Sequence, residues 1–169
     1  EHDAGGLVGL SAASNPNSPE LWPQLNLTRP RVDVFESAPR LRWAIKSAAP
    51  ADDRALLWGD FHFANSLAKS LRSLGQLVSV DYQENSSRPT SGLDDVVLNL
   101  RGLRDISLPS TSLNLLWVIS HPDDVTAAEV SKYHISYAAS NSWAVAQTEQ
   151  WGLPIRPLLQ CTDSELFYP

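Results

Sequence analysis

Short apolar segments alternate with polar, turn-forming segments from residue 39 onward. Most of the apolar segments are continuous runs, a pattern typical of parallel strands that are buried on both faces of a sheet. The predicted strands cover residues 41–46, 77–80, 96–100, 113–119, 135–139 and 155–159. The last of them is predicted to be an edge strand, because Pro157 cannot donate a hydrogen bond to a neighbouring strand.

Helical periodicity fills most of the gaps between these strands. Apolar residues three to four positions apart, from Phe61 to Leu74, predict a helix that Asp60 caps and Gly75 ends. Two more helices are predicted over residues 126–132 and 142–151.

Strands that alternate with helices at this spacing predict an α/β fold. We expect a doubly wound, mostly parallel Rossmann-like sheet with helices on both faces. The connection between the third and fourth strands is the least regular part of this prediction. It spans about a dozen residues without an evident helix, which is near the minimum for a parallel crossover.

The first part of the chain has a different composition. Prolines interrupt residues 1–38, so we expect an extended N-terminal arm there and a Rossmann-like domain over residues 39–169. Within the arm, Val32 and Val34 are compatible with a short edge strand, and Trp22 could dock on a surface. The chain begins without Met and ends on Tyr168-Pro169, and we expect it to be a piece of a longer protein.

Composition narrows the range of functions. A chain of 169 residues, 43% apolar, suits one domain with a single core. Its net charge of −6, without a cluster of Lys and Arg, argues against binding to nucleic acid. The single cysteine, Cys161, is typical of a reducing compartment, and no apolar run approaches the roughly 20 residues of a membrane helix. The N-terminus lacks the pattern of a secretion signal. We therefore expect a cytoplasmic protein without a membrane span.

Polar residues crowd the points where the predicted strands end. In open parallel sheets, ligands bind outside the carboxyl ends of the strands, near the point where the strand order reverses. The simpler interpretation is that any strand becomes polar where it meets water. The candidate ligand-binding residues at these ends are Lys46, Arg101, Gly102, Ser120 and Asp163.

The segment Trp58-Gly-Asp-Phe-His-Phe63 opens the first predicted helix beside the end of the first strand. Gly59 allows close approach of a ligand, and the free N–H groups of a helix start suit a phosphate. Asp60 is either a helix cap or a ligand-binding residue. His62 lies off the apolar face, so it is either a general base that takes a proton from a sugar hydroxyl or a surface histidine.

His121 follows the fourth strand, and Asp123 or Asp124 could orient its ring. This is either a general-base pair or the cap of the next helix. His134 is expected to be structural. The chain contains no Gly-x-Gly-x-x-Gly motif, no phosphate-binding P-loop and no Gly-x-Ser-x-Gly motif. Its His, Cys, Asp and Glu residues also lack the spacing of metal ligands. We therefore predict no bound cofactor or metal.

Several short motifs, in order, resemble the N-terminal domain of CgeB-like bacterial glycosyltransferases. They are Ile45-Lys46…Ala49-Pro50, Trp58-Gly-Asp-Phe-His-Phe-Ala64, Asp95-Val-Val-Leu…Arg101-Gly102, Leu116-Trp-Val-Ile-Ser-His-Pro-Asp123 and Leu159-Gln-Cys-Thr-Asp163…Phe167-Tyr-Pro169. The resemblance covers residues 40–169.

The resemblance implies one half of a GT-B architecture, in which two Rossmann-like domains face each other across a cleft. The N-terminal domain would receive a carbohydrate or protein acceptor, and a C-terminal domain missing from this chain would hold the nucleotide-sugar donor. No metal would be required. By position, the loops after the first and fourth strands would supply Asp60, His62, His121 and Asp123, and Arg101-Gly102 would line the cleft floor. The chain alone would then be inactive.

Two other functions remain open. The six tryptophans and the proline-rich arm are compatible with a non-catalytic protein-interaction module that has a degenerate transferase fold. An epimerase with the same two-domain architecture is the third possibility.

Overall fold

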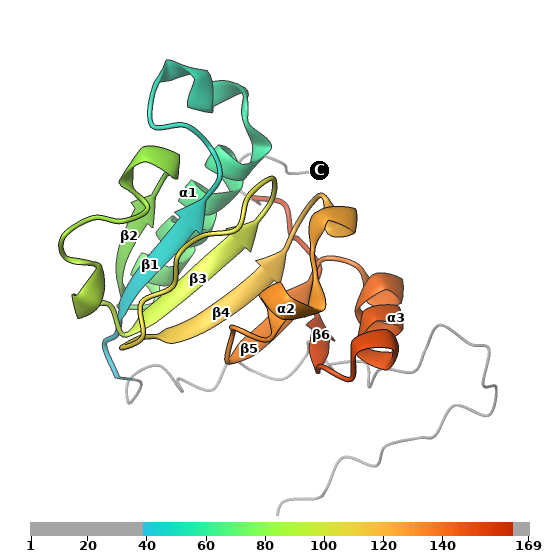
Figure 1. Cartoon of the computed structure of the whole chain (residues 1–169). Coiled ribbons are helices and arrows are strands. Elements are labelled where there is room, and N and C mark those ends of the chain that lie inside the picture. Colours follow the sequence, from blue (N-terminus) through green and yellow to red (C-terminus); the bar gives the residue numbers. More distant parts are fainter. Residues whose placement is uncertain (1–38, 164–169) are drawn as a thin grey trace, which may run out of the picture. The chain divides into compact units, whose positions relative to one another are not determined.

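The computed structural model describes residues 39–163, so the predicted arm over residues 1–38 and its edge strand lie outside the described part. Within residues 39–163, six strands form one sheet in the order β2-β1-β3-β4-β5-β6, and all neighbouring strands are parallel (Figure 1). The strands are β1 (Arg42–Ser47), β2 (Leu77–Asp81), β3 (Val96–Arg101), β4 (Leu113–Val118), β5 (Ile135–Ala138) and β6 (Ile155–Pro157). The predicted α/β class and the parallel sheet are confirmed.

Helices and short turns connect the strands. The α-helices are α1 (Gly59–Ser73), α2 (Ala127–Val130) and α3 (Asn141–Trp151), and the 3-10 turns are η2 (Asp53–Leu57), η3 (Gln83–Asn85), η4 (Ser91–Leu93) and η5 (Pro122–Asp124). None of the helices in the described residues is long and apolar enough to cross a membrane.

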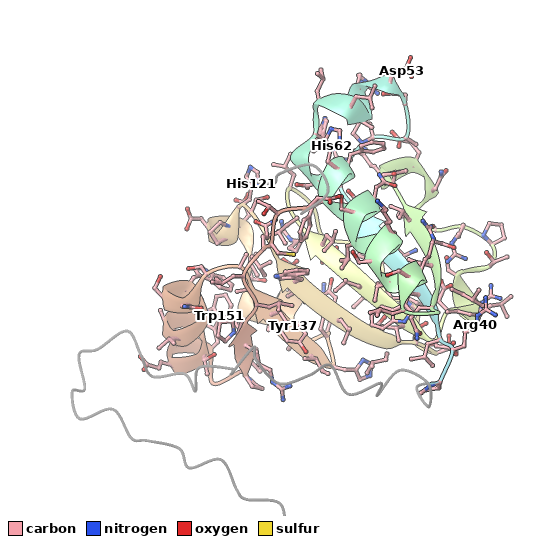
Figure 2. The ribbon with its side chains drawn as sticks, turned by 180° about the vertical axis from the view of Figure 1, so that it is seen from behind. Arg40, Asp53, His62, His121, Tyr137 and Trp151 are labelled. Carbon is pink, nitrogen blue, oxygen red and sulfur yellow. The ribbon has the colours of Figure 1, made fainter. Side chains whose placement is uncertain are left out.

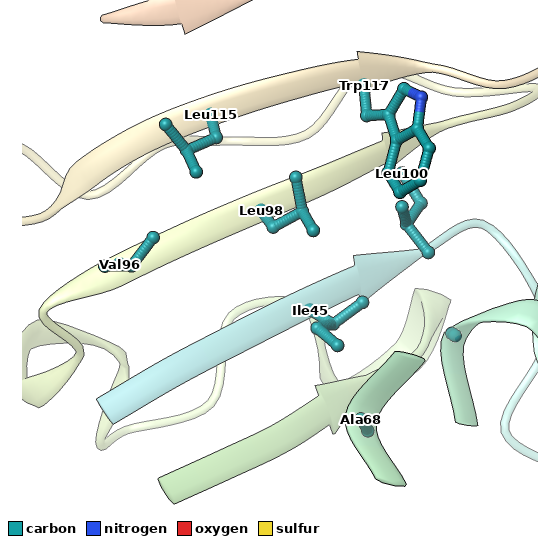
Figure 3. Close-up of a cluster of buried hydrophobic side chains, with 8 residues drawn as sticks. Ile45, Ala68, Val96, Leu98, Leu100, Leu115 and Trp117 are labelled. Atoms are coloured by element: carbon teal, nitrogen blue, oxygen red, sulfur yellow. The ribbon is translucent and has the colours of Figure 1, made fainter. Parts of the chain in front are cut away.

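The sheet is covered on both faces, as a doubly wound fold requires. Successive side chains of a strand point to opposite faces. Leu98, Leu100 and Trp117 pack with Ala64 and Ala68 of α1 on one face (Figure 3). The opposite face has its own cluster, in which β4 meets α2 and α3. That second cluster contains Leu116, Val118, Val125, Val130, Tyr133, Ala138, Ala144 and Ile155.

The connection between β3 and β4 contains no helix, as expected for residues 102–112. The two strands are nevertheless parallel and in register from Val96–Leu113 to Arg101–Val118. Leu108 from this connection packs against the second core cluster, and the hydroxyl of Ser112 donates to the backbone oxygen of Asp94. The loop therefore covers part of the sheet face that a helix covers elsewhere.

The end of α1 and the bounds of α3 agree with the prediction to within one residue, but α2 is shorter than the predicted 126–132 and α1 starts before Asp60. The N-cap position is Trp58, which makes no side-chain cap bond, and Asp60 lies in the first turn. The prediction that Asp60 caps the helix is therefore wrong. Gly75 and Gly152 follow α1 and α3 with φ angles of 82° and 66°. This left-handed backbone favours glycine and ends each helix.

The strand order places the chain reversal next to β1. The chain passes from β1 to β2 on one side and then returns to β3 on the other side. The gap between the carboxyl ends of β1 and β3 is therefore the topological switch point, where parallel sheets form ligand sites. The residues that follow β1, β3 and β4 form the rim of this site.

Candidate functional site

Four residues gather at the rim, and we call them the rim cluster: Asp60, Gly102, Ser120 and His121. Gly102 is buried directly after β3. A Cβ atom at Gly102 would clash with Oδ2 of Asp60 and would come within 3.3 Å of Oγ of Ser120. The absence of a side chain at Gly102 is therefore what allows the Asp60 carboxylate to lie against the end of β3.

Ser120 and His121 add a hydroxyl and an imidazole to the carboxylate. Oγ of Ser120 lies 3.0 Å from Nδ1 of the exposed His121. Figure 2 shows His121 and His62 at the same end of the domain. Three groups that exchange protons thus come from α1 and from the end of β4.

The backbone of His121 is unusual. Its φ of 49° and ψ of 50° are left-handed, and it is the one non-glycine residue among residues 39–163 with a positive φ. Histidine tolerates this region better than most residues, but the conformation still costs about 1 kcal/mol or more. Backbone strain of this kind concentrates at functional sites.

The Asp60 carboxyl has a perturbed proton affinity. Partial burial raises the pKa of Asp60 above its ordinary value of 3.8, and the positive charge of His121 acts in the opposite direction. Burial disfavours the ionised carboxylate, whereas an opposite charge nearby favours it. The charge of His121 therefore acts on the protonation of Asp60.

His62, predicted as an alternative base, does not join the rim cluster. It is exposed, as expected from its position off the apolar face, and its Nε2 lies 2.9 Å from the backbone oxygen of Leu56 in η2. Because a carbonyl oxygen only accepts, Nε2 must carry the proton in this contact. Gly59 is exposed beside it, and a Cβ atom there would meet open space.

Lys46 is not available to a ligand, contrary to the prediction. Its side chain is 1% exposed, and Nζ lies 2.5 Å from Oδ2 of Asp81 and donates to the backbone oxygen of Ser86. Arg88 bonds the same Asp81 and also Asp94. We call Lys46, Asp81, Arg88 and Asp94 the buried ion network. Lys46 points to the face that the connection between β2 and β3 covers, and not beyond the end of the strand.

Arg101 was predicted to line the floor of an open cleft, and it does not. Its side chain bonds other residues of the domain instead. It is 3% exposed, and its Nε lies 2.6 Å from Oε1 of Glu129 in α2. Its other nitrogens donate to the backbone oxygens of Gly102 and Asp124. Arg101 therefore ties the end of β3 to the turn that carries His121.

The two remaining predicted carboxylates lie elsewhere. The exposed side chain of Asp123 makes no hydrogen bond or ion pair with another residue of the described part, so the expected orientation of His121 by Asp123 is not observed. The carboxylate that interacts electrostatically with His121 is that of Asp60 instead. Oδ2 of Asp163 accepts a hydrogen bond of 2.8 Å from the hydroxyl of Ser66 in α1, which attaches the segment after β6 to this helix.

Two openings lie at the carboxyl ends of the strands, and the sequence did not indicate them. A hollow of about 250 Å³ lies beside the ends of β1, β2 and β3 and is lined by Pro50, Arg54, Trp58, Gln83, Glu84 and Arg104. A smaller cleft lies between the ends of β4 and β5. Within the described part of the chain, no three His, Cys, Asp or Glu side chains form a group that could hold a metal ion.

The fold and the rim cluster together define the class: an all-parallel, doubly wound α/β domain with a carboxyl, a hydroxyl and an imidazole near its switch point. Comparison with protein-family models, with curated proteins and with solved structures finds no match to this chain.

Proposed function

We propose that this domain receives the acceptor in a glycosyl transfer reaction, as the N-terminal half of a GT-B transferase of the CgeB-like kind. The observation that carries the proposal is the rim cluster at the switch point, where the Asp60 carboxylate lies against Gly102 beside Ser120 and His121. A sugar hydroxyl needs a base that is neutral near pH 7, and imidazole is the side chain that meets this requirement.

In the proposed reaction, His121 acts as the base. When Nδ1–H donates to the hydroxyl of Ser120, Nε2 is free to take the proton of the acceptor hydroxyl. The acceptor oxygen then attacks the anomeric carbon of the nucleotide-sugar. The bond from that carbon to the diphosphate breaks, and the diphosphate leaves with the electron pair. The ionised Asp60 carboxylate stabilises the imidazolium that forms.

His121 is a better base than His62 for a geometric reason. The contact with Leu56 occupies Nε2 of His62 and holds its ring against η2. His121 is exposed, its ring contacts the hydroxyl of Ser120, and its charge interacts with the Asp60 carboxylate. The proposal therefore assigns the proton transfer to His121 alone.

The proposal also requires a second, donor-binding domain. A transferase gains most of its rate by orienting two substrates and neutralising the leaving diphosphate. One half of the cleft would bind acceptor and would transfer nothing by itself.

The test is turnover in the full-length protein, measured by mass spectrometry of products formed from a panel of nucleotide-sugars and sugar acceptors. His121→Asn is expected to lower kcat by about 10²–10⁴-fold, the usual contribution of a general base. Asn is chosen because it also tolerates the left-handed backbone. His62→Asn is the matched control and is expected to keep turnover within about threefold. Equal turnover in the wild type and in His121→Asn would refute the proposal.

The alternative is a non-catalytic interaction module, and one observation favours it. Leu56 and Leu57 in η2 are 61% and 88% exposed beside the rim. Exposed apolar groups of this kind can serve as interface anchors. The module predicts that Leu56→Ser with Leu57→Ser abolishes binding of a partner protein and that His121→Asn leaves this binding unchanged. The transferase predicts loss of turnover in His121→Asn.

A further inference from the structure

The cleft between the carboxyl ends of β4 and β5 opens next to the rim cluster. Its volume is about 70 Å³, and it is lined by Val118, Ile119, Ser120, Pro122, Ala138, Ala139, Ser140 and Trp143. Ser120 belongs to both the cleft and the rim cluster, and Pro122 directly follows His121. A ligand whose hydroxyl meets His121 therefore has this cleft beside it.

The cleft is apolar although it lies where strands usually turn polar. Val118 and Ala138 are buried, while Trp143 of α3 is partly exposed and packs edge-on against Trp151. The room exists because the last residue of β5, Ala138, and the residue after it, Ala139, are both small.

The two hydroxyls of the cleft already have partners. The hydroxyl of Ser140 accepts from the backbone N–H of Trp143 as the cap of α3, and the hydroxyl of Ser120 contacts His121. The side chains that remain to contact a ligand are aliphatic or aromatic. The cleft therefore selects an apolar group.

The size of the cleft limits that group. A volume of about 70 Å³ is about half that of a cavity of roughly 150 Å³ that holds one benzene molecule. The cleft therefore suits a methyl or an acetyl group and is too small for a phenyl ring or a long alkyl chain.

From this geometry we propose that the cleft is a subsite for a small apolar substituent of the acceptor, such as the methyl end of an acetamido group, next to the hydroxyl that His121 deprotonates. The inference rests on the proposed function and names the acceptor class: a sugar that carries an acetyl or methyl group near its reacting hydroxyl. The substituent would also fix the orientation of the sugar on the rim.

Binding of two simple sugars to the full chain tests the subsite. N-acetylglucosamine and glucose differ by the acetamido group, and their affinities can be compared by NMR titration. We expect N-acetylglucosamine to bind at least about fourfold more tightly, the value of one buried methyl group. Its methyl protons are expected to show contacts to the indole ring of Trp143 in the wild-type protein.

A substitution that fills the cleft provides a second test of the subsite. Ala139→Leu is expected to remove the preference for N-acetylglucosamine by occupying the cleft. Ala128→Leu adds the same atoms at an exposed position of α2 and is expected to keep the preference. The methyl contact to Trp143 needs no substitution, so the test remains valid if Ala139→Leu does not fold.

The outcomes separate the two proposals. Equal affinity for both sugars at the rim, or a preference that survives Ala139→Leu, would overturn the subsite and leave the proposed function in place. A methyl contact in the cleft, together with unchanged turnover in His121→Asn, would keep the subsite and overturn the transferase mechanism. Failure of N-acetylglucosamine to bind at the rim would overturn the subsite, whereas the turnover of His121→Asn in the full-length protein decides the proposed function separately.

Discussion

The buried ion network and the rim cluster both contain polar residues near the ends of strands, but the two regions differ in their exposure to solvent. Lys46 and Asp81 are almost inaccessible, and the network supplies both with charged partners. Asp60 is half-buried and His121 is exposed, and Asp60 retains a pKa raised by burial.

The difference shows which polar residues can take part in chemistry. A buried charge with all its partners in place holds the fold, and removing one partner is costly because the other stays buried without compensation. A partly exposed group with a perturbed pKa can still exchange protons with a ligand. The pair formed by Arg101 and Glu129 lies between these cases, because it is buried and yet holds the turn of His121.

The largest effect is expected in the ion network. Asp81→Ala would leave Lys46 buried without its carboxylate and would remove one partner of Arg88. We expect the free energy of unfolding to fall by about 3–5 kcal/mol, measured by urea denaturation. The control is Lys132→Ala, which breaks an exposed pair with Asp105 and is expected to change the free energy of unfolding by less than about 1 kcal/mol. Equal midpoints for the two variants would show that the network is not structural.

A smaller effect is expected where the two regions meet. Glu129→Gln would remove the charge that pairs with Arg101, at a cost of about 2–3 kcal/mol of unfolding free energy. Because Arg101 also bonds the backbone of Asp124, we expect the amide NMR shifts of residues 121–124 to change. Unchanged shifts in this turn would mean that Arg101 does not position His121.

Gly102→Ala tests the packing of the rim cluster. The new Cβ would clash with the Asp60 carboxylate, and we expect a loss of about 1 kcal/mol, the lower end of the cost of overpacking, because this side chain can rotate away. In an Asp60→Ala background the loss is expected to disappear, which a double-mutant cycle measures. Gly92→Ala, where a Cβ meets open space, is the control. Additive losses would show that Asp60 does not contact Gly102.

The smallest effect concerns pH. Because the pKa of Asp60 in the folded protein is raised, its contribution to stability is present at low pH and is lost as the pH rises through that pKa. Asp60→Asn cannot ionise and avoids this loss. Its stability relative to the wild type is therefore expected to increase from pH 3.5 to pH 7, by less than about 1 kcal/mol because the side chain is only half-buried. A pH-independent difference in urea midpoints would contradict the raised pKa.

Much of the fold could be predicted because buried parallel strands have a distinctive sequence. Continuous apolar runs such as Val96–Leu100 predict strands that are buried on both faces. The ends of α1 and α3 could be predicted because Gly75 and Gly152 readily adopt the left-handed backbone that ends a helix. The predicted start of α1 was wrong because Asp60 is a residue type that commonly caps helices. Its actual contact, with Gly102, depends on the position of β3, which the local sequence does not show.

The site was predictable only in part, for a related reason. The rule that ligands bind at the carboxyl ends of strands selected Gly102, Ser120 and His121 together with Lys46 and Arg101, and Asp60 was selected from its place at the start of the first helix. Only the tertiary structure separates these groups. The partners that bury Lys46 and Arg101 are Asp81 and Glu129, which lie 35 and 28 residues away in the chain. The apolar cleft was missed because Ala138 and Ala139 resemble ordinary core residues.

The most direct test of the rim cluster is an NMR titration of the Asp60 carboxyl in the wild-type protein and in His121→Asn. We predict a pKa above the ordinary value of 3.8 in the wild type and a still higher pKa in the variant, because His121 no longer offsets the effect of burial. An unperturbed pKa that is identical in both proteins would contradict the electrostatic link between Asp60 and His121 on which the proposed chemistry depends.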